Sequence, residues 1–305
     1  MKLQNTLTIL TIGLFLISFN SLAKEPSKAI VACNDAVNKG DGAAALQLSE
    51  AILKKNASDH EGLLCKGRAL GLQNKYTEAI TSFEQAIKST EDSFAQVVSY
   101  ILMGNLHKTN NKTGEAIVSY NNSLKICAKT NNQTYSRINH NLIGDAHTQA
   151  KDLNAALDSY LVGVRLANND NERAESFEKT AVTYNTLGQY DKAVEFQLKA
   201  VLMQQKAGTL TAYADASLAL GQYYYNAENY SNAERVYKKL AKFGKDNGGA
   251  YYEAKANFRL AEALAANGDK EAAKPLLSNA LNQANKIGAK QLASEIDASQ
   301  KKLNI

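Results

Sequence analysis

One pattern of side-chain sizes recurs along this chain and restricts its fold more than any other feature. In the segment GRALGLQNKYTEAITSFEQAI, Gly67 is followed twelve, sixteen and nineteen positions later by Ala79, Phe83 and Ala86. The first and most degenerate copy has the residues Ala32, Ala44, Leu48 and Ala51. The alanines at the second position of the seven copies are Ala44, Ala79, Ala116, Ala156, Ala193, Ala233 and Ala273. Their nearly regular spacing indicates a tandem repeat.

The pattern fits two antiparallel helices joined by a short turn. Ala79 and Phe83 lie on one helical stripe, because four residues complete about one turn. Small residues on two facing helices let the backbones approach closely, and the large residue fills the space beside that contact. The chain has only two prolines among its 305 residues, which favours helix almost throughout. One hairpin cannot bury its own apolar face, so we expect successive hairpins to stack into a continuous core.

The repeat resembles the tetratricopeptide repeat family. The resemblance is carried by the small residue of the first helix, a turn such as Gly188-Gln-Tyr190-Asp, and the order Ala, aromatic, Ala in the second helix. It covers residues 24–286, with repeat spacings longer than the usual value of about 34. The resemblance implies an all-α fold, an α-α superhelix with a concave groove, in which residues 24–288 form about seven helix-turn-helix repeats. Residues 289–305 are expected to form a C-terminal capping helix.

Residues 1–23 are typical of a secretory signal peptide. Lys2 precedes an apolar run from Leu7 to Phe19, and small residues stand at both cleavage positions of the tripeptide that ends at Ala23. We expect cleavage after Ala23 and a periplasmic or secreted mature protein. The alternative is a retained membrane anchor, but a spanning helix needs about 20 apolar residues and this run is shorter. No later run is apolar enough to span a bilayer, so no stable membrane insertion is expected after cleavage.

Charge and motifs argue against two other classes of protein. The 35 basic residues are scattered singly or in pairs among 30 acidic ones, whereas a nucleic-acid binder clusters them on one face. The sequence contains no P-loop, no GxGxxG, no HExxH and no GxSxG motif. We therefore expect a non-enzymatic scaffold or adaptor without a cofactor, which binds a protein or peptide partner in its groove. The alternative is a periplasmic sensor module in which the groove responds to a small ligand or peptide. The oligomeric state stays open.

Two cysteines are expected to stabilise the weak first repeat. By the geometry of the family, Cys33 and Cys65 project from the first helices of adjacent repeats toward the groove, and export to an oxidising compartment favours a disulfide between them. The alternative is two separate thiols, because an alignment error of one residue would rotate Cys33 by about 100°. Cys127 has no evident partner and is expected to be a partly buried free thiol.

Three histidines are candidate metal ligands. His107, His140 and His147 lie on stripes that face the hairpin core, so we expect hydrogen-bonded packing and no metal site.

A set of polar residues is expected to face the groove and bind the partner. Asn and Gln side chains can bond both the donors and the acceptors of an extended peptide, and Tyr225 adds an apolar surface with a polar tip. The alternative is a surface that is only solvated. The residues expected to face the groove are Arg68, Asn105, Asn141, Asp145, Gln149, Lys179, Asn185, Gln222, Tyr225, Arg259 and Glu262.

Overall fold

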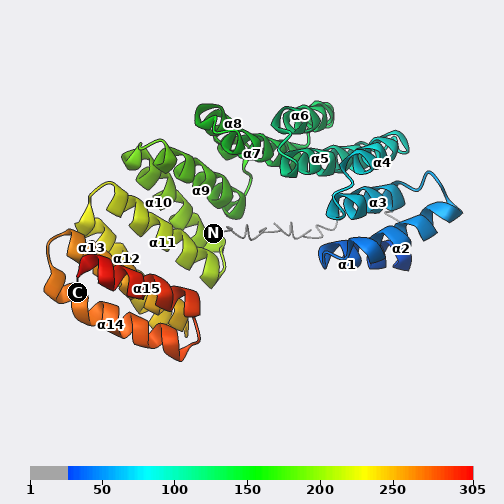
Figure 1. Ribbon diagram of the computed structural model, residues 1–305. Coiled ribbons are helices and arrows are strands. Elements are labelled where there is room, and N and C mark those ends of the chain that lie inside the picture. Colours follow the sequence, from blue (N-terminus) through cyan, green and yellow to red (C-terminus); the bar gives the residue numbers. More distant parts are fainter. Residues whose placement is uncertain (1–26, 305) are drawn as a thin grey trace. The chain divides into compact units, whose positions relative to one another are not determined.

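The computed structural model describes residues 27–304, and every regular element in this range is an α-helix (Figure 1). The expected signal segment, residues 1–23, and its cleavage site lie outside the described residues. None of the helices between residues 27 and 304 combines the length and the hydrophobicity that a membrane span needs.

Fourteen helices of the described range form seven antiparallel pairs, and a fifteenth follows them. The first helices of the pairs are α1 (Lys28–Asn38), α3 (His60–Leu72), α5 (Ser93–Thr109), α7 (Gln133–Gln149), α9 (Asp170–Thr186), α11 (Leu210–Asn226) and α13 (Ala250–Ala266). The second helices are α2 (Gly42–Lys55), α4 (Tyr76–Lys88), α6 (Thr113–Lys129), α8 (Leu153–Leu166), α10 (Tyr190–Ala207), α12 (Tyr230–Asp246) and α14 (Lys270–Lys286). The last helix is α15 (Lys290–Leu303).

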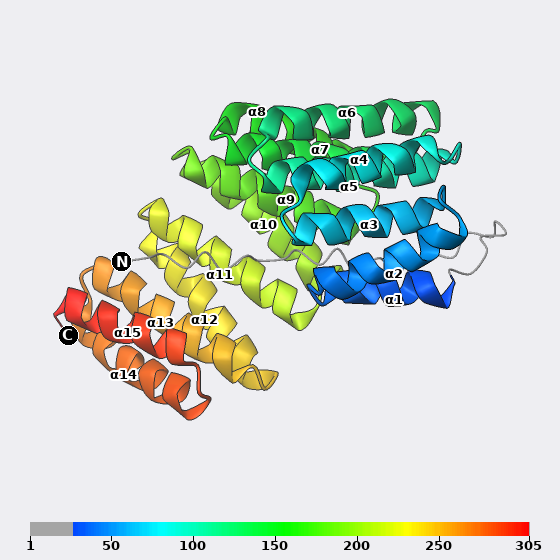
Figure 2. The ribbon, with the colours of Figure 1, turned by 45° about the vertical axis from the view of Figure 1, so that its right-hand side comes forward.

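The chain divides into two compact units after Thr130. Unit 1 contains α1 to α6 and unit 2 contains α7 to α15. Within each unit every helix packs against the helix before and after it, and α11 to α15 follow one another side by side (Figure 2). First helices also contact first helices, as α1 contacts α3 and α11 contacts α13. The expected fold class is confirmed, because this is the all-α, α-α superhelix class built from stacked helix pairs.

The size pattern marks the contact between the two helices of a pair. In four pairs a glycine of the first helix faces an aromatic ring of the second helix, and a Cβ atom added at the glycine would come within 3.0 Å of that ring. These pairs are Gly67 with Phe83, Gly104 with Tyr120, Gly144 with Tyr160 and Gly221 with Tyr237. Where the first position is alanine the later residue is not aromatic, as in Ala181 with Gln197 and Ala261 with Leu277. The glycine therefore makes room for the ring.

The first pair carries the pattern one residue later than expected. Cys33, Ala45 and Ser49 are fully buried, whereas Ala32 and Ala51 are exposed. The expected order Ala32, Ala44, Leu48, Ala51 is therefore corrected to Cys33, Ala45, Ser49, Ile52. The error has a simple cause, because residues 43 to 45 are all alanine and their sizes cannot distinguish the register.

The turns between paired helices support this corrected register. A residue with positive φ stands seven positions after the small first residue in every pair, and these residues are Gly40, Asn74, Asn111, Lys151, Gly188, Glu228 and Gly268. The next backbone N–H closes the first helix, as the N–H of Gln189 does by donating to the carbonyl of Tyr184 at 2.9 Å. The same residue is the N-cap of the second helix. Gly40 joins this series only when Cys33 is the first position.

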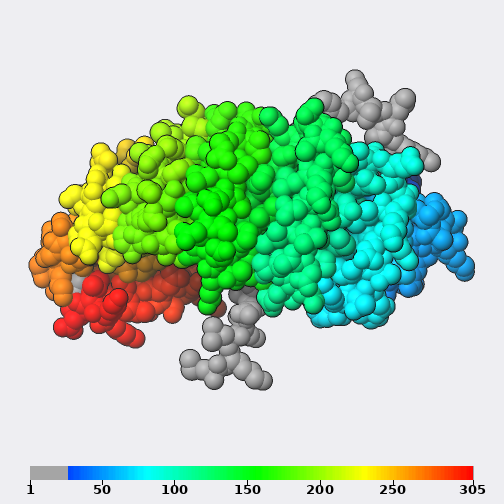
Figure 3. Space-filling model, turned by 90° about the horizontal axis from the view of Figure 1, so that it is seen from above, coloured from blue at the N-terminus to red at the C-terminus, as the bar shows by residue number. Residues whose placement is uncertain are grey.

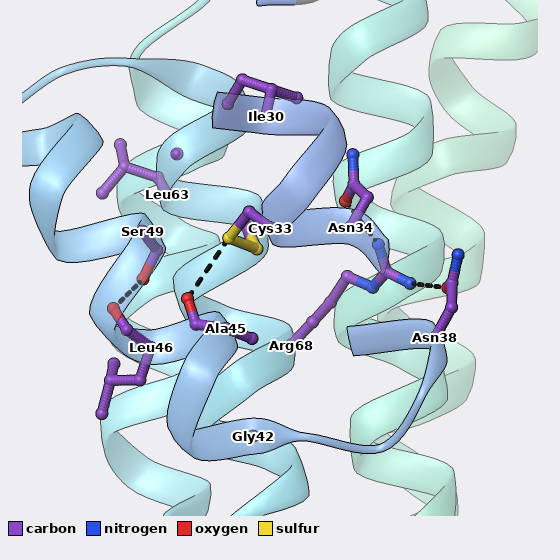
Figure 4. The surroundings of a disulfide bond; sticks show 12 residues. Ile30, Cys33, Asn34, Asn38, Gly42, Ala45, Leu46, Ser49, Leu63 and Arg68 are labelled. Atoms are coloured by element: carbon purple, nitrogen blue, oxygen red, sulfur yellow. Dashed lines mark hydrogen bonds between the residues drawn. A yellow bond between two sulfur atoms is a disulfide. The ribbon is translucent and has the colours of Figure 1, made fainter. Parts of the chain in front are cut away.

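The structure joins Cys33 and Cys65 by a disulfide that ties α1 to α3, with a Cα–Cα distance of 6.3 Å (Figure 4). The expectation that these cysteines project toward a groove is wrong, because both are buried in a core cluster with Ala45 and Ala69. The corrected register turns Cys33 toward α2, where the carbonyl oxygen of Ala45 lies 3.2 Å from its Sγ. The disulfide is therefore part of the core. Cys127, in α6, lies outside the disulfide and is fully buried, where partial burial was expected.

Helix α15 covers the end of the last pair. Leu292 and Ile296 are buried in the cluster formed with α13 and α14, and the atoms of α15 adjoin those of α14 in the space-filling view (Figure 3). On its other side Ser294, Asp297 and Lys301 are exposed. A buried inner face with a polar outer face is what a terminal repeat of a solenoid requires.

We expect the substitution Gly104→Ala to lower the free energy of unfolding by about 1–3 kcal/mol, because the new methyl group would overlap the ring of Tyr120. The matched control is Gly114→Ala in the neighbouring helix α6, where a Cβ atom meets nothing within 4 Å. Alanine there should be neutral or stabilise by up to about 1 kcal/mol. Urea unfolding followed by circular dichroism measures both, and equal effects of the two substitutions would contradict the proposed contact.

Removal of the disulfide should loosen one end of unit 1. The double substitution Cys33→Ala, Cys65→Ala releases a loop with a sequence separation of 32 residues, which corresponds to about 3–4 kcal/mol in the chain-entropy model. Because repeat stability is local, we expect amide protection against hydrogen exchange to fall in residues 28–55. Protection in unit 2 serves as the internal control and should not change. Unchanged protection in α1 and α2 would show that the disulfide is dispensable.

Candidate functional site

Polar side chains on the first helices of unit 2 are linked from one helix to the next. We call this set the polar ladder. Its rungs are Asp145 with Lys179, Asn185 with Asn226, and Glu262 with Ser299. They connect α7 to α9, α9 to α11, and α13 to α15, so the ladder follows the stack of first helices within this unit.

The first rung is centred on Asp145. One oxygen of this carboxylate accepts hydrogen bonds from Lys179 Nζ at 2.7 Å and from the Tyr160 hydroxyl at 2.7 Å. The Lys179 ammonium also lies 5.6 Å from the centre of the Tyr160 ring. Burial, together with the charge of Asp145, raises the pKa of the Tyr160 hydroxyl far above its ordinary value, so this hydroxyl remains a donor. A core residue of α8 thereby holds a ladder residue of α7 in place.

The second rung consists of amides. Asn226 Nδ2 donates to Asn185 Oδ1 at 2.8 Å, and Gln222 Nε2 donates to Asn226 Oδ1 at 2.9 Å. All three side chains are half-buried. Each amide still has donor or acceptor capacity beyond these two bonds. The rung is therefore fixed in position and still able to bond another chain.

The third rung is ionic. Arg259 Nη1 donates to Glu262 Oε2 at 2.6 Å, and Ser299 Oγ donates to Glu262 Oε1 at 2.9 Å. Glu295 on α15 lies 3.9 Å from Arg259 Nη2. Both oxygens of Glu262 are thus occupied by partners within the protein.

Between α11 and α13 the ladder has no rung among the described residues, and a pocket of about 170 Å³ lies there. Its lining residues are Gln222, Tyr225, Tyr237, Arg259, Glu262 and Lys302. Burial raises the pKa values of the Tyr225 and Tyr237 hydroxyls above their ordinary range. Both phenols therefore remain protonated at neutral pH.

Unit 1 has a smaller polar cluster on its first helices. The Arg68 guanidinium donates to Asn34 Oδ1 at 2.8 Å and to Asn38 Oδ1 at 3.0 Å, which links α3 to α1 (Figure 4). Burial lowers the pKa of Arg68 from its ordinary value, but a guanidinium stays charged in proteins. Asn105 Oδ1 accepts a hydrogen bond from the Tyr120 hydroxyl at 2.8 Å.

Most residues expected to face the groove belong to the ladder or the pocket of unit 2. These are Asp145, Lys179, Asn185, Gln222, Tyr225, Arg259 and Glu262. Arg68 and Asn105 lie on the first helices of unit 1, and Gln149 lies exposed in the last turn of α7.

The assignment of Asn141 to an open groove is wrong. Its side chain is 3% exposed, and its Nδ2 lies 3.5 Å from both Ser176 Oγ and Glu175 Oε1. Gly163 on α8 leaves the space that the amide occupies, since a Cβ atom there would overlap Asn141. Asn141 therefore packs between three helices.

Four residues of the ladder and pocket were not identified from the sequence: Asn226, Tyr237, Ser299 and Lys302. Tyr237 follows Ala233 by four residues, so its place in the repeat predicts only a core residue. Ser299 and Lys302 follow Arg259 and Glu262 at the interval that separates Ala233 from Ala273. This is the spacing of the last repeats, so the signal was present once α15 is treated as a further first helix.

The histidines pack as side chains of the hairpins. His107 is buried, and its Nδ1 and the Tyr76 hydroxyl share a hydrogen bond of 2.6 Å. Burial lowers the pKa values of His107 and His140, and His147 Nδ1 lies 3.9 Å from Asp152. Within residues 27–304 no group of three or more His, Cys, Asp or Glu side chains is arranged to hold a metal ion.

Comparison with known proteins identifies the repeat. Two family models described as tetratricopeptide repeat match residues 32–94 and 174–206. No curated protein matches the chain by sequence.

Several solved structures share the fold at low sequence identity. The apo form of RapI has a TM-score of 0.65 and 14% identity, over 93% of this chain and 88% of that one. A tetratricopeptide repeat-containing signal transduction ATPase of the STAND class from Pyrococcus horikoshii has a TM-score of 0.66 and 17% identity, over 88% of this chain and 44% of that one. Kinesin light chain-like repeats from Podospora anserina have a TM-score of 0.55 and 18% identity, over 64% of this chain and 97% of that one.

At sequence identities this low, the solved structures support the fold alone. The seven helix pairs, the recurring order of residue sizes within them and the two matching family models agree with one another. Residues 32–94 and 174–206 are therefore tetratricopeptide repeats, and the described chain has the fold of tetratricopeptide repeat proteins.

Proposed function

We propose that this protein is an exported, non-enzymatic interaction protein whose polar ladder binds a segment or domain of another protein. The tetratricopeptide repeat fold supports a protein-binding scaffold. We place the site at the ladder because its residues on successive first helices are already hydrogen-bonded to one another. Few side chains then lose freedom on binding, and this lowers the entropic cost of association.

The chemistry of the ladder suits the backbone of an extended segment. Amides of Asn185, Gln222 and Asn226 offer both donors and acceptors, so they can bond either peptide group of a partner. The charged rungs at Asp145 and Arg259 are paired within the protein, and they give the surface no strong preference for one sign of charge. Many modest polar contacts are therefore expected.

Export is supported by two independent features. Residues 1–23 have the order of charge, apolar run and small residues that defines a signal peptide. The buried disulfide between Cys33 and Cys65 is a bond that persists in oxidising compartments. The proposed location is the periplasm or the exterior of the cell.

A ligand-responsive sensor is the second candidate. The pocket between α11 and α13 favours it, because this is a site where a small molecule could bind. The Pyrococcus horikoshii structure is described as carrying a tetratricopeptide repeat sensor, although the likeness to it concerns the fold alone.

A photo-crosslinking amino acid in place of Val182 tests the proposal. Val182 follows the small residue of α9, as Asp145 and Gln222 follow the small residues of α7 and α11, and it is 50% exposed. The matched control is Leu198 on the second helix α10, which is 42% exposed. We expect irradiation of cells to give a protein adduct at position 182 and none at 198, and mass spectrometry of the adduct identifies the bound segment.

Adducts of equal yield at both positions would contradict binding at the ladder. A small molecule that is retained through purification, without an adduct at position 182, would support the sensor instead.

We expect the mature protein to begin at Lys24, as measured by intact mass spectrometry of protein from the periplasmic or extracellular fraction. The substitution Leu14→Arg interrupts the apolar run and should leave a full-length precursor inside the cell. Leu72→Arg, in an exposed position of α3, is the control and should not affect export. Recovery of full-length protein from the exported fraction would contradict cleavage after Ala23.

A further inference from the structure

The exposed face of helix α12 gathers the basic side chains of this helix into a single stripe, which we call the cationic stripe. Its members follow one another at intervals of no more than four residues, so they cover only about a third of the helix circumference. They lie opposite the buried Ala233, Tyr237 and Leu240. The members are Arg235, Lys238, Lys239, Lys242 and Lys245, and all five are exposed. Basic residues that are scattered along most of the sequence are thus collected on one face of this helix.

Most of this positive charge is not neutralised within the helix. Lys238 forms an ion pair with Glu234, and Lys242 forms one with Asp246 at 3.0 Å. The five basic and two acidic residues of α12 leave a net charge of +3. Three members of the stripe have no ion pair among the described residues, and these are Arg235, Lys239 and Lys245.

The stability of the helix does not account for the stripe. A cation in the last turn of a helix interacts favourably with the helix dipole, and this applies to Lys245. Arg235, Lys238 and Lys239 lie earlier in the helix, where like charges three or four residues apart repel one another.

The repeat does not account for it either. The corresponding positions of the neighbouring second helices lie forty residues before and after those of α12. On α10 these positions hold Glu195, Leu198, Lys199, Leu202 and Gln205. On α14 they hold Pro275, Ser278, Asn279, Asn282 and Asn285. The stripe is therefore a property of α12 and not of the fold.

An exposed apolar surface adjoins the stripe. Leu198 and Leu202 on α10 are 42% and 47% exposed, and Leu210 at the start of α11 is 58% exposed. A pocket of about 220 Å³ lies where these three helices meet, because its lining includes Gln205 of α10, Leu210 of α11 and Lys239 of α12. Exposed leucines and unpaired cations thus lie on one surface of unit 2.

We propose that this surface binds an anionic lipid bilayer, with the cationic stripe at the headgroups and the exposed leucines at the boundary of the acyl chains. Basic residues close to an anionic membrane are attracted to it, and leucine gains from burial at this boundary. A second copy of this chain, docked face to face, would place one net positive surface against another. A nucleic acid would bond the cations and leave the leucines in water.

The proposed bilayer contact lies on the second helices and the start of α11, whereas the polar ladder consists of side chains of the first helices and of Ser299 on α15. It therefore adds a second binding surface to the proposed function. The vesicle experiments below do not depend on an adduct at position 182.

Co-sedimentation with lipid vesicles tests the proposal. Protein purified from the exported fraction is mixed with vesicles of phosphatidylcholine alone or of equal parts phosphatidylcholine and phosphatidylglycerol. We expect it to sediment with the anionic vesicles only, and high salt should release it because salt screens the attraction. Equal binding to both kinds of vesicle, or no binding to the anionic ones, would overturn the proposal.

A triple substitution tests the stripe itself. Changing Arg235, Lys239 and Lys245 to glutamine removes the three unpaired cations and should weaken binding to the anionic vesicles about 100-fold. The matched control makes the same change at three exposed lysines in the last turns of other second helices, Lys54→Gln, Lys88→Gln and Lys129→Gln. The control loses the same net charge and should bind nearly as well as the parent. Equal losses in the two variants would show attraction to net charge alone and would overturn the proposal.

A substitution of leucine distinguishes a bilayer from a soluble polyanion. Leu210→Gln should weaken binding to the anionic vesicles about fivefold, because an apolar side chain no longer leaves water. The control is Val118→Gln on α6, where the side chain is 59% exposed, and it should not affect binding. A short DNA duplex is the polyanion probe, and any binding of it should not respond to Leu210→Gln. Vesicle binding that is equally insensitive to Leu210→Gln would mean that the cations alone are recognised, and it would overturn a bilayer as the occupant.

Discussion

The contact between the small first position of each pair and the larger residue that faces it on the second helix controls how closely the two helices approach. Glycine accepts an aromatic ring at this contact in four pairs, and alanine accepts Gln197 or Leu277. In the first pair the combination is Cys33 with Ser49. The two volumes compensate each other, as close packing in protein interiors requires. Every hairpin can then stack on the next with a similar geometry, although the residues differ from pair to pair.

The residue at the larger position of this contact also affects which polar side chains of the first helices are held in place. A tyrosine at the large position passes over the glycine, and its hydroxyl meets the residue that follows, as Tyr160 meets Asp145. Phe83 and Leu277 have no such group. Gln197 is directed toward the next pair, where its Nε2 donates to the carbonyl of Ala216 at 2.9 Å. Two of the three tyrosines at this position therefore fix a polar residue of the first helix, as Tyr120 fixes Asn105 and Tyr160 fixes Asp145.

The sequence predicts the repeat and its helix pairs because they depend on residue sizes at fixed spacings. The predicted register of the first repeat is wrong, because three consecutive alanines fit the small position equally well and only the turn at Gly40 distinguishes between them. It fails at Asn141 because the space for this amide is provided by Gly163 on another helix. The pocket is not predictable from spacing, because the Gln222 amide bonds Asn226 on its own helix, whereas Asn105 and Asp145 at the same repeat position bond the tyrosines of their pairs.

A solenoid has no single central cavity, so each interface between successive first helices is a separate place where polar groups are either joined or left open. In unit 2, rungs join α9 to α11 and α13 to α15. The interface between α11 and α13 has no rung among the described residues, and the pocket lies there. Helix α15 adds to this interface. It continues the register of the first helices, and Lys302 on α15 stands where Glu262 stands on α13. Arg259 bonds one carboxylate oxygen of Glu262, and Ser299 on α15 bonds the other. The helix that covers the apolar end of the stack therefore also lines the pocket, through Lys302. Both roles follow from adding one more first helix without its partner.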